Sequence, residues 1–77
     1  MNATVARQQS RRISAAITAH NGHCWQNAIQ ALRHLPGGKL AIGWATLASG
    51  RRVEHAWIEL ADGRIVDPTP STSGGVV

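Results

Sequence analysis

Three residues, Cys24, His55 and Asp67, carry the side chains that nucleophilic catalysis needs: a thiol, an imidazole and a carboxylate. The thiolate of cysteine is a strong nucleophile. Histidine is suited to deprotonate it because the ordinary pKa of imidazole, about 6.5, lies close to neutral pH. A carboxylate that accepts a hydrogen bond from the imidazole would orient this base. The three residues are far apart in sequence, so the chemistry depends on the elements that carry them.

Cys24 opens a predicted helix. In residues 24–35 apolar side chains recur three and four positions apart, and the Pro36-Gly37-Gly38 segment ends the pattern. At the first turn of a helix the backbone N–H groups are unpaired and the dipole is positive, which favours the thiolate over the thiol. A turn at residues 20–23 separates this helix from another, predicted over residues 3–19. The weak apolar stripe of that first helix contains Val5, Ile13, Ala16 and Ile17.

After residue 38 the apolar period changes from helical to alternating, which indicates strands. Residues 40–47 alternate in a way that predicts a strand with both faces covered, and residues 53–60 and 64–67 predict two more strands. In the second strand, Ala56 and Ile58 fall on one face, and His55 and Trp57 fall on the other. The predicted fold class is α+β, with an N-terminal helix and a nucleophile helix packed on a small three-stranded antiparallel sheet.

The turn at residues 61–63 decides whether His55 and Asp67 can meet. In a three-residue loop with a left-handed glycine, residue 60 pairs with residue 64, and Asp67 then falls opposite Trp57. His55 becomes its diagonal neighbour on the same face, about 7–8 Å away between Cα atoms and within reach of a hydrogen bond. A two-residue Asp62-Gly63 loop would shift the register by one and place Asp67 on the wrong face.

Three segments together resemble a known family: HCWQNA at residues 23–28, EHAWIE at 54–59 and DGRIVDPT at 62–69. They look like the transglutaminase-like branch of the papain-type fold, especially its compact bacterial and phage versions. In those versions a Gly-Trp-Ala strand, here residues 43–45, follows the helix. The small leader-peptide proteases of lasso-peptide biosynthesis are also similar. The resemblance covers residues 22–69. It implies Cys24 as nucleophile, His55 as base and Asp67 as orienter, amide hydrolysis or acyl transfer as the reaction, and no metal or organic cofactor.

The oxyanion glutamine of this family has no obvious counterpart upstream of Cys24. The backbone N–H of Cys24 and the side chains of Asn21 and Gln26 are therefore the candidates for oxyanion or substrate binding. Trp57 is a further candidate for substrate contact, although all three tryptophans are better explained as core residues. One helical turn after His23, the sequence places an asparagine that we expect to connect the helix to the sheet.

Each residue of the triad also has a structural explanation. Cys24 could be a small buried apolar residue, His55 a core histidine bonded to backbone, and Asp67 a turn residue before Pro68. The second functional hypothesis is therefore a catalytically inactive binding or inhibitor module of phage or mobile-element type. Such a module would dock a protein or nucleic acid through a basic surface, since the net charge is +4.

Composition indicates a small folded domain. The chain has 77 residues, of which 43% are hydrophobic, and we expect one domain over residues 1–70 with a flexible tail at 71–77. The lone cysteine excludes an internal disulfide, and no apolar run approaches the roughly 18 residues of a membrane span. A soluble cytoplasmic protein without a membrane partner is expected.

The sequence also bears on metals and partners. His20, His23 and Cys24 could be metal ligands, but three crowded residues without a fourth do not make a structural zinc site. We expect no metal. A peptide or protein amide substrate is the expected partner, and a partner protein, a homodimer or nucleic acid are the alternatives.

Overall fold

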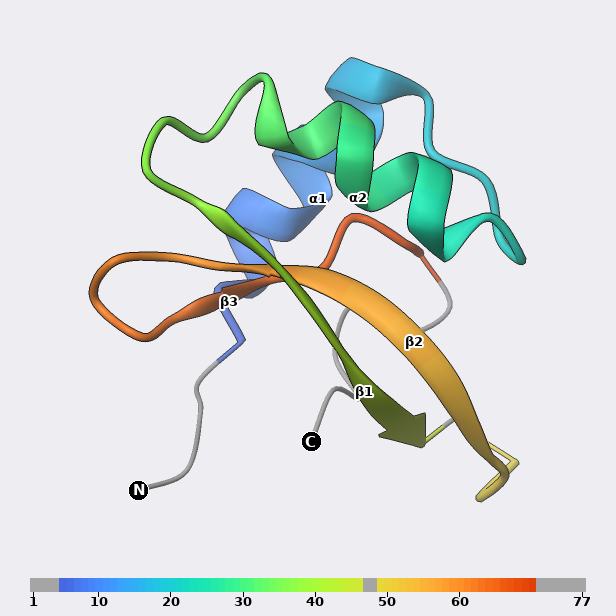
Figure 1. Cartoon of the computed structure of the whole chain (residues 1–77). Helices are drawn as coiled ribbons and strands as arrows, with labels where there is room; N and C mark the ends of the chain where they lie inside the picture. The colour runs from blue at the N-terminus through green and yellow to red at the C-terminus, as the bar shows by residue number, and fades with distance from the viewer. Residues whose placement is uncertain (1–4, 47–48, 71–77) are drawn as a thin grey trace.

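The computed structural model describes residues 5–46 and 49–70 and has the predicted α+β fold. Two helices pack on a three-stranded antiparallel sheet (Figure 1). The predictions for residues 1–4, for residue 47 and for the tail at 71–77 lie outside the described residues. In chain order the elements are α1 (Arg7–Ile17), α2 (Cys24–Leu32), β1 (Lys39–Thr46), β2 (Arg52–Glu59) and β3 (Ile65–Val66).

Both helices are shorter than predicted. The α1 helix ends at Ile17 because Thr18 adopts a left-handed conformation with φ 55° and ψ 59°. The α2 helix begins at Cys24 as predicted but ends at Leu32 rather than at residue 35. Beyond it the N–H groups of residues 33–35 bond to carbonyls three positions back, and such tighter turns do not continue an α-helix.

The sheet has the order β1-β2-β3. β1 pairs with β2 along its whole length, whereas β3 pairs with only the last two residues of β2, through Ile58↔Val66 and Glu59↔Ile65. The predicted three-residue turn is confirmed: Gly63 has φ 87°, and the Leu60 N–H donates to the Arg64 carbonyl at 2.8 Å. One further step in this register sets Asp67 opposite Trp57.

The main core lies between α2 and one face of the sheet. Ala28 and Ala31 of α2 pack with Ala56 and Ile58 of β2, and Val66 of β3 joins them. Since successive residues of a strand point to opposite faces, His55 and Trp57 lie on the face turned away from α2. A second cluster on that face contains Trp57, Ile65, Val5 and Ala41.

The prediction that β1 is covered on both faces is wrong. Leu40, Ile42 and Trp44 are 37%, 55% and 51% exposed on the face of β1 that continues the α2 side of the sheet. A helix is about 10 Å across and strands are about 4.8 Å apart, so α2, which is centred on β2, leaves much of β1 uncovered. The expectation that all three tryptophans are core residues holds only for Trp57: Trp44 is exposed with the rest of this face of β1, and Trp25 is exposed on α2.

Neither helix of the described residues has the length and apolar character that crossing a bilayer would require.

Candidate active site

His55 and Asp67 form a buried pair. The His55 Nε2 atom lies 2.9 Å from both carboxylate oxygens of Asp67, and the two residues are 2% and 0% exposed. The hydrogen bond predicted from the turn register is thereby confirmed. A carboxylate only accepts hydrogen bonds, so this contact assigns a proton to Nε2, and proton exchange with a nucleophile would run through Nδ1.

Two hydrogen bonds position Asp67, one with α1 near the start of the chain and one with the segment that follows β3. Its backbone N–H donates to the Ser10 hydroxyl at 3.0 Å, and its Oδ1 accepts a hydrogen bond from the Thr69 N–H at 3.2 Å. Ser10 is fully buried in α1. Ser10 was not among the residues predicted for the site. Its spacing from Ile13 and Ile17 places it on the apolar stripe of α1, and a hydroxyl on such a stripe needs a partner.

Trp57 packs beside His55. The two ring centroids are 6.0 Å apart with the planes inclined at 30°, and Trp57 is only 8% exposed. Gly43, the cross-strand partner of His55, makes room for this ring: a Cβ at position 43 would lie 2.6 Å from Trp57 Cη2. Trp57 is therefore a core residue that packs against the His55 ring, and little of its own surface is exposed to a substrate.

Cys24 is half-buried at the first turn of α2, and it is a free thiol. His23, which precedes it, makes no side-chain capping hydrogen bond to this turn. The helix dipole places partial positive charge at this end, where a negative sulfur would be favoured. Cys24 shares its helical face with the buried Asn27, Ala28 and Ala31, so it lies on the side of α2 that faces the sheet.

A chain of hydrogen bonds connects the Cys24 helix to the histidine. The Asn27 Nδ2 donates to the Thr69 Oγ1 at 3.0 Å, Thr69 donates through its N–H to Asp67, and Asp67 holds His55. Asn27 also bonds both backbone groups of His20, which fixes the turn before α2. This asparagine, which we expected to connect the helix to the sheet, instead bonds the segment that follows β3.

Cys24 itself is not joined to the pair. Within the described residues no hydrogen bond links the Cys24 sulfur to the His55 ring. The reason lies in the faces of β2, because Ala56 faces α2 and its neighbour His55 points the other way. The structure thus brings two of the three predicted site residues together and places the third one helical turn before the hydrogen-bonded chain.

The two candidate oxyanion side chains are accessible. Asn21 lies in the turn before α2 and Gln26 in its first turn, and both are exposed. A side chain in the first turn of α2 is close in sequence to the thiol, so a role for Gln26 beside Cys24 stays a prediction.

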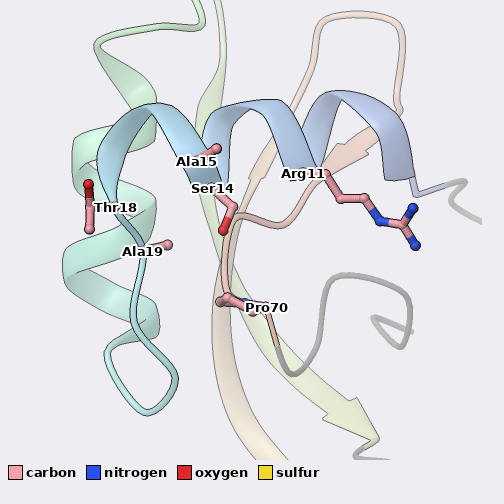
Figure 2. Close-up of a pocket in the computed structure, with 6 residues that line it drawn as sticks. All are labelled: Arg11, Ser14, Ala15, Thr18, Ala19 and Pro70. Carbon is pink, nitrogen blue, oxygen red and sulfur yellow. The ribbon is translucent and has the colours of Figure 1, made fainter.

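Two hollows of the described surface lie away from the triad. A cavity of about 520 Å³ separates α1 from Pro70 and is lined by none of Cys24, His55 and Asp67. Figure 2 shows the Ser14 hydroxyl directed toward Pro70, whereas the Arg11 side chain extends away from it. A second hollow of about 400 Å³ at the start of α1 is lined by Arg7, Arg12 and Arg64 together with Ala6, Gln8 and Gln9.

The histidines before α2 do not form a metal centre with their neighbours. The rings of His20 and His23 meet edge to face at 6.1 Å between centroids. In the part of the chain that the structure describes, no three His, Cys, Asp or Glu side chains are grouped as metal ligands would be.

Comparison of the chain with protein-family models, with curated proteins and with solved structures found no match.

Proposed function

We propose that the protein is a thiol-dependent hydrolase or acyltransferase that acts on peptide or protein amides through Cys24, His55 and Asp67. The observation that carries this proposal is the buried His55–Asp67 hydrogen bond, in which one ring nitrogen contacts both carboxylate oxygens at 2.9 Å. A carboxylate that orients an imidazole in this way is the arrangement that nucleophilic catalysis uses to hold a general base.

The reaction proceeds through an acyl-enzyme. His55 accepts the thiol proton at Nδ1, and the Cys24 sulfur attacks the amide carbonyl carbon to form a tetrahedral intermediate. As the C–N bond breaks, the imidazolium returns its proton to the leaving amine. Water or a second amine, deprotonated by His55, then attacks the thioester carbonyl, and the thiol is regenerated. Backbone N–H groups at the start of α2, with the Gln26 side chain nearby, stabilise the oxyanion.

This chemistry requires the thiol to approach the histidine around the edge of β2. Because β3 pairs with only Ile58 and Glu59, the segment from Asp67 onward leaves the sheet next to His55 and contacts α2 through Thr69 and Asn27. Residues one helical turn apart lie about 5–6 Å from each other, so Cys24 lies near the same segment as Asn27. The proposal places the sulfur and Nδ1 together at this edge.

The chemistry suits a reducing compartment, because Cys24 must remain a free thiol. We therefore also propose that the protein is cytoplasmic.

Alkylation of the native protein tests the proposal. A thiolate held by His55 should react with iodoacetamide at pH 7 roughly tenfold faster than a free cysteine, because few free thiols are ionised at that pH. The same chain unfolded in urea provides the matched control and should react at the free-thiol rate. Incubation with p-nitrophenyl acetate should add one acetyl group to the wild type and none to folded Cys24→Ala. Native alkylation no faster than in urea would contradict the proposal.

Burial of the pair favours a second candidate function. His55 is 2% and Asp67 0% exposed, so the pair can stabilise the core of a binding module that has no catalytic activity. Three arginines around the 400 Å³ hollow at the start of α1 would then supply the basic docking surface. A slowly alkylated, fully folded protein whose His55→Gln variant unfolds would support this candidate.

A further inference from the structure

Large apolar side chains are exposed on one side of the molecule. Besides Leu40, Ile42 and Trp44 of β1, Trp25 and Ile29 of α2 are 41% and 50% exposed. Two of the three tryptophans of the chain therefore lie outside its core, although four alanines are among the buried residues that the structure describes. We call these five residues the α2–β1 face.

The five side chains belong to one surface. Leu40, Ile42 and Trp44 alternate along β1 and pair with Ile58, Ala56 and Glu54 of β2, so they continue the sheet face on which α2 packs. Trp25 and Ile29 are one turn apart on α2, on the flank opposite the one where Asn27 bonds Thr69 beyond β3. In Figure 1, α2 lies in front of α1 and β1 crosses in front of β2, so both elements of the face are on one side of the molecule.

The outer edge of β1 has few of the features that prevent edge pairing. β1 has eight residues, contains no proline and carries a single charged residue, Lys39, at its start. The opposite edge of the sheet is paired: Val5 forms a parallel bridge with Ile65, and the Ala6 N–H donates to the Ile65 carbonyl at 2.8 Å. The β1 edge, by contrast, has no strand partner among the described residues along its whole length and is a template for another strand.

The apolar area of the face matches that of a dimer interface. Such side chains carry about 200 Å² each, so their exposed fractions amount to roughly 450 Å² of apolar surface. A stable interface buries about 800 Å² per partner, and about 65% of a homodimer interface is apolar, which is roughly 500 Å². Five side chains therefore supply nearly the whole apolar part of a standard interface.

We propose that the α2–β1 face binds a second copy of the chain, with the two β1 strands paired antiparallel about a two-fold axis near Ile42. The arrangement would join two three-stranded sheets into one of six strands and set Leu40 beside Trp44 of the other copy. Each end of the strand pair carries both signs of charge, Lys39 with Glu59 at one end and Arg51 and Arg52 with Glu54 at the other. A two-fold axis therefore brings acidic and basic residues together at each end and leaves only a small positive excess.

The same charge balance argues against nucleic acid on this face. A surface that binds phosphates needs a dense basic stripe, whereas the basic residues of this rim, Lys39, Arg51 and Arg52, are interspersed with Glu54 and Glu59. The proposed interface does not depend on the reactivity of Cys24, so it can be tested independently of the proposed catalysis.

Sedimentation equilibrium of the full chain tests the proposal, with Ile42→Lys as the disrupting variant. The wild type should shift from 8.2 kDa to twice that mass as its concentration rises, and tryptophan emission should shift to the blue as Trp25 and Trp44 become buried. Because the axis places Ile42 of both copies together, one substitution acts twice, and Ile42→Lys should weaken dimerisation roughly 100-fold or more. Gln30→Lys, an exposed α2 position on the other flank, is the matched control and should dimerise like the wild type.

Three results would overturn the proposal. The wild type could remain at 8.2 kDa up to millimolar concentration, or the Ile42→Lys variant could dimerise as tightly as the wild type. A monomer that instead captures an apolar peptide or another protein on this face would show that the occupant is not a second copy. Cys24→Ala should dimerise normally, which separates this outcome from any failure of the catalytic proposal.

Discussion

At the β3 edge of the sheet the decisive side chains are polar, buried and hydrogen-bonded, whereas at the β1 edge they are apolar and exposed. Ser10, Asp67, Thr69 and His55 form a connected set beside β3, and no buried side-chain nitrogen or oxygen within the described residues lacks a partner. On the α2 side of β1, by contrast, Ile42 and its neighbours contact solvent.

The two edges differ in how strongly their side chains fix the positions of neighbouring residues. A buried polar group must find a particular partner, so each member of the β3 set fixes the position of the next. Exposed apolar side chains impose no such internal geometry, and the second copy of the chain that we propose would account for their exposure. The β3 edge is therefore suited to precise chemistry and the β1 edge to association.

The largest expected effect comes from removing the carboxylate at the β3 edge. Asp67→Ala leaves the buried His55 ring and the Thr69 N–H without their acceptor, and we expect it to lower the free energy of unfolding by about 3 kcal/mol. Urea denaturation followed by circular dichroism measures this loss. Glu54→Ala, an exposed position on β2, is the control and should stay within about 0.5 kcal/mol of the wild type. Equal free energies of unfolding for the two variants would show that the buried Asp67 carboxylate contributes no more to stability than an exposed one.

A second prediction tests how tightly the Gly43 side of β1 is packed, in contrast to its exposed Ile42 side. Gly43→Ala places a Cβ 2.6 Å from Trp57 Cη2, so the ring beside His55 must move, at a cost of about 1–3 kcal/mol. In the Trp57→Leu background the obstructing ring is absent, and the same substitution should cost much less. Urea denaturation of the four proteins in this cycle measures the coupling. Additive effects would show that Gly43 does not serve the Trp57 ring.

The smallest effect concerns the exposed turn that sets the β2–β3 register. The Arg64 backbone N–H, and then its guanidinium, hold the pKa of Asp62 below its ordinary value. The stabilisation is therefore complete above the unfolded-state pKa of Asp62 and is lost as pH falls through its lowered folded-state pKa. Carboxyl NMR titration should find the lowered pKa largely retained in Arg64→Ala, because the backbone N–H is the larger cause. An ordinary pKa for Asp62 in the wild type would contradict this account of the turn.

The β2–β3 hairpin could be predicted from the sequence because its geometry is local. Gly63 permits the left-handed conformation, the loop length sets the register, and the register brings Asp67 to the face of His55. Alternation of side chains along β2 was sufficient to separate Ala56 from His55. The start of α2 at Cys24 followed in the same way from local turn residues and helical spacing.

Contacts between distant segments could not be predicted. The Ser10–Asp67 and Asn27–Thr69 hydrogen bonds join residues 57 and 42 positions apart, and no sequence periodicity encodes which hydroxyl meets which group. The coverage of β1 was predicted wrongly because apolar alternation on both faces reads the same whether a face meets its own core or another molecule. Trp44 illustrates the ambiguity, since its size favours a core position and the structure leaves it half exposed.

The most direct test of the central claim is a nuclear Overhauser measurement on the native protein between the Cys24 Hβ protons and the His55 Hε1 proton, which is bonded to the carbon next to Nδ1. The claim that Cys24 meets the histidine at the edge of β2 predicts a clear cross-peak between these protons, and the single cysteine of the chain makes its assignment unambiguous. The His55–Trp57 cross-peak expected from their 6.0 Å ring contact serves as the internal reference. If the reference peak is present and the Cys24–His55 peak is absent, the thiol and the imidazole do not form one site, and the catalytic account is wrong.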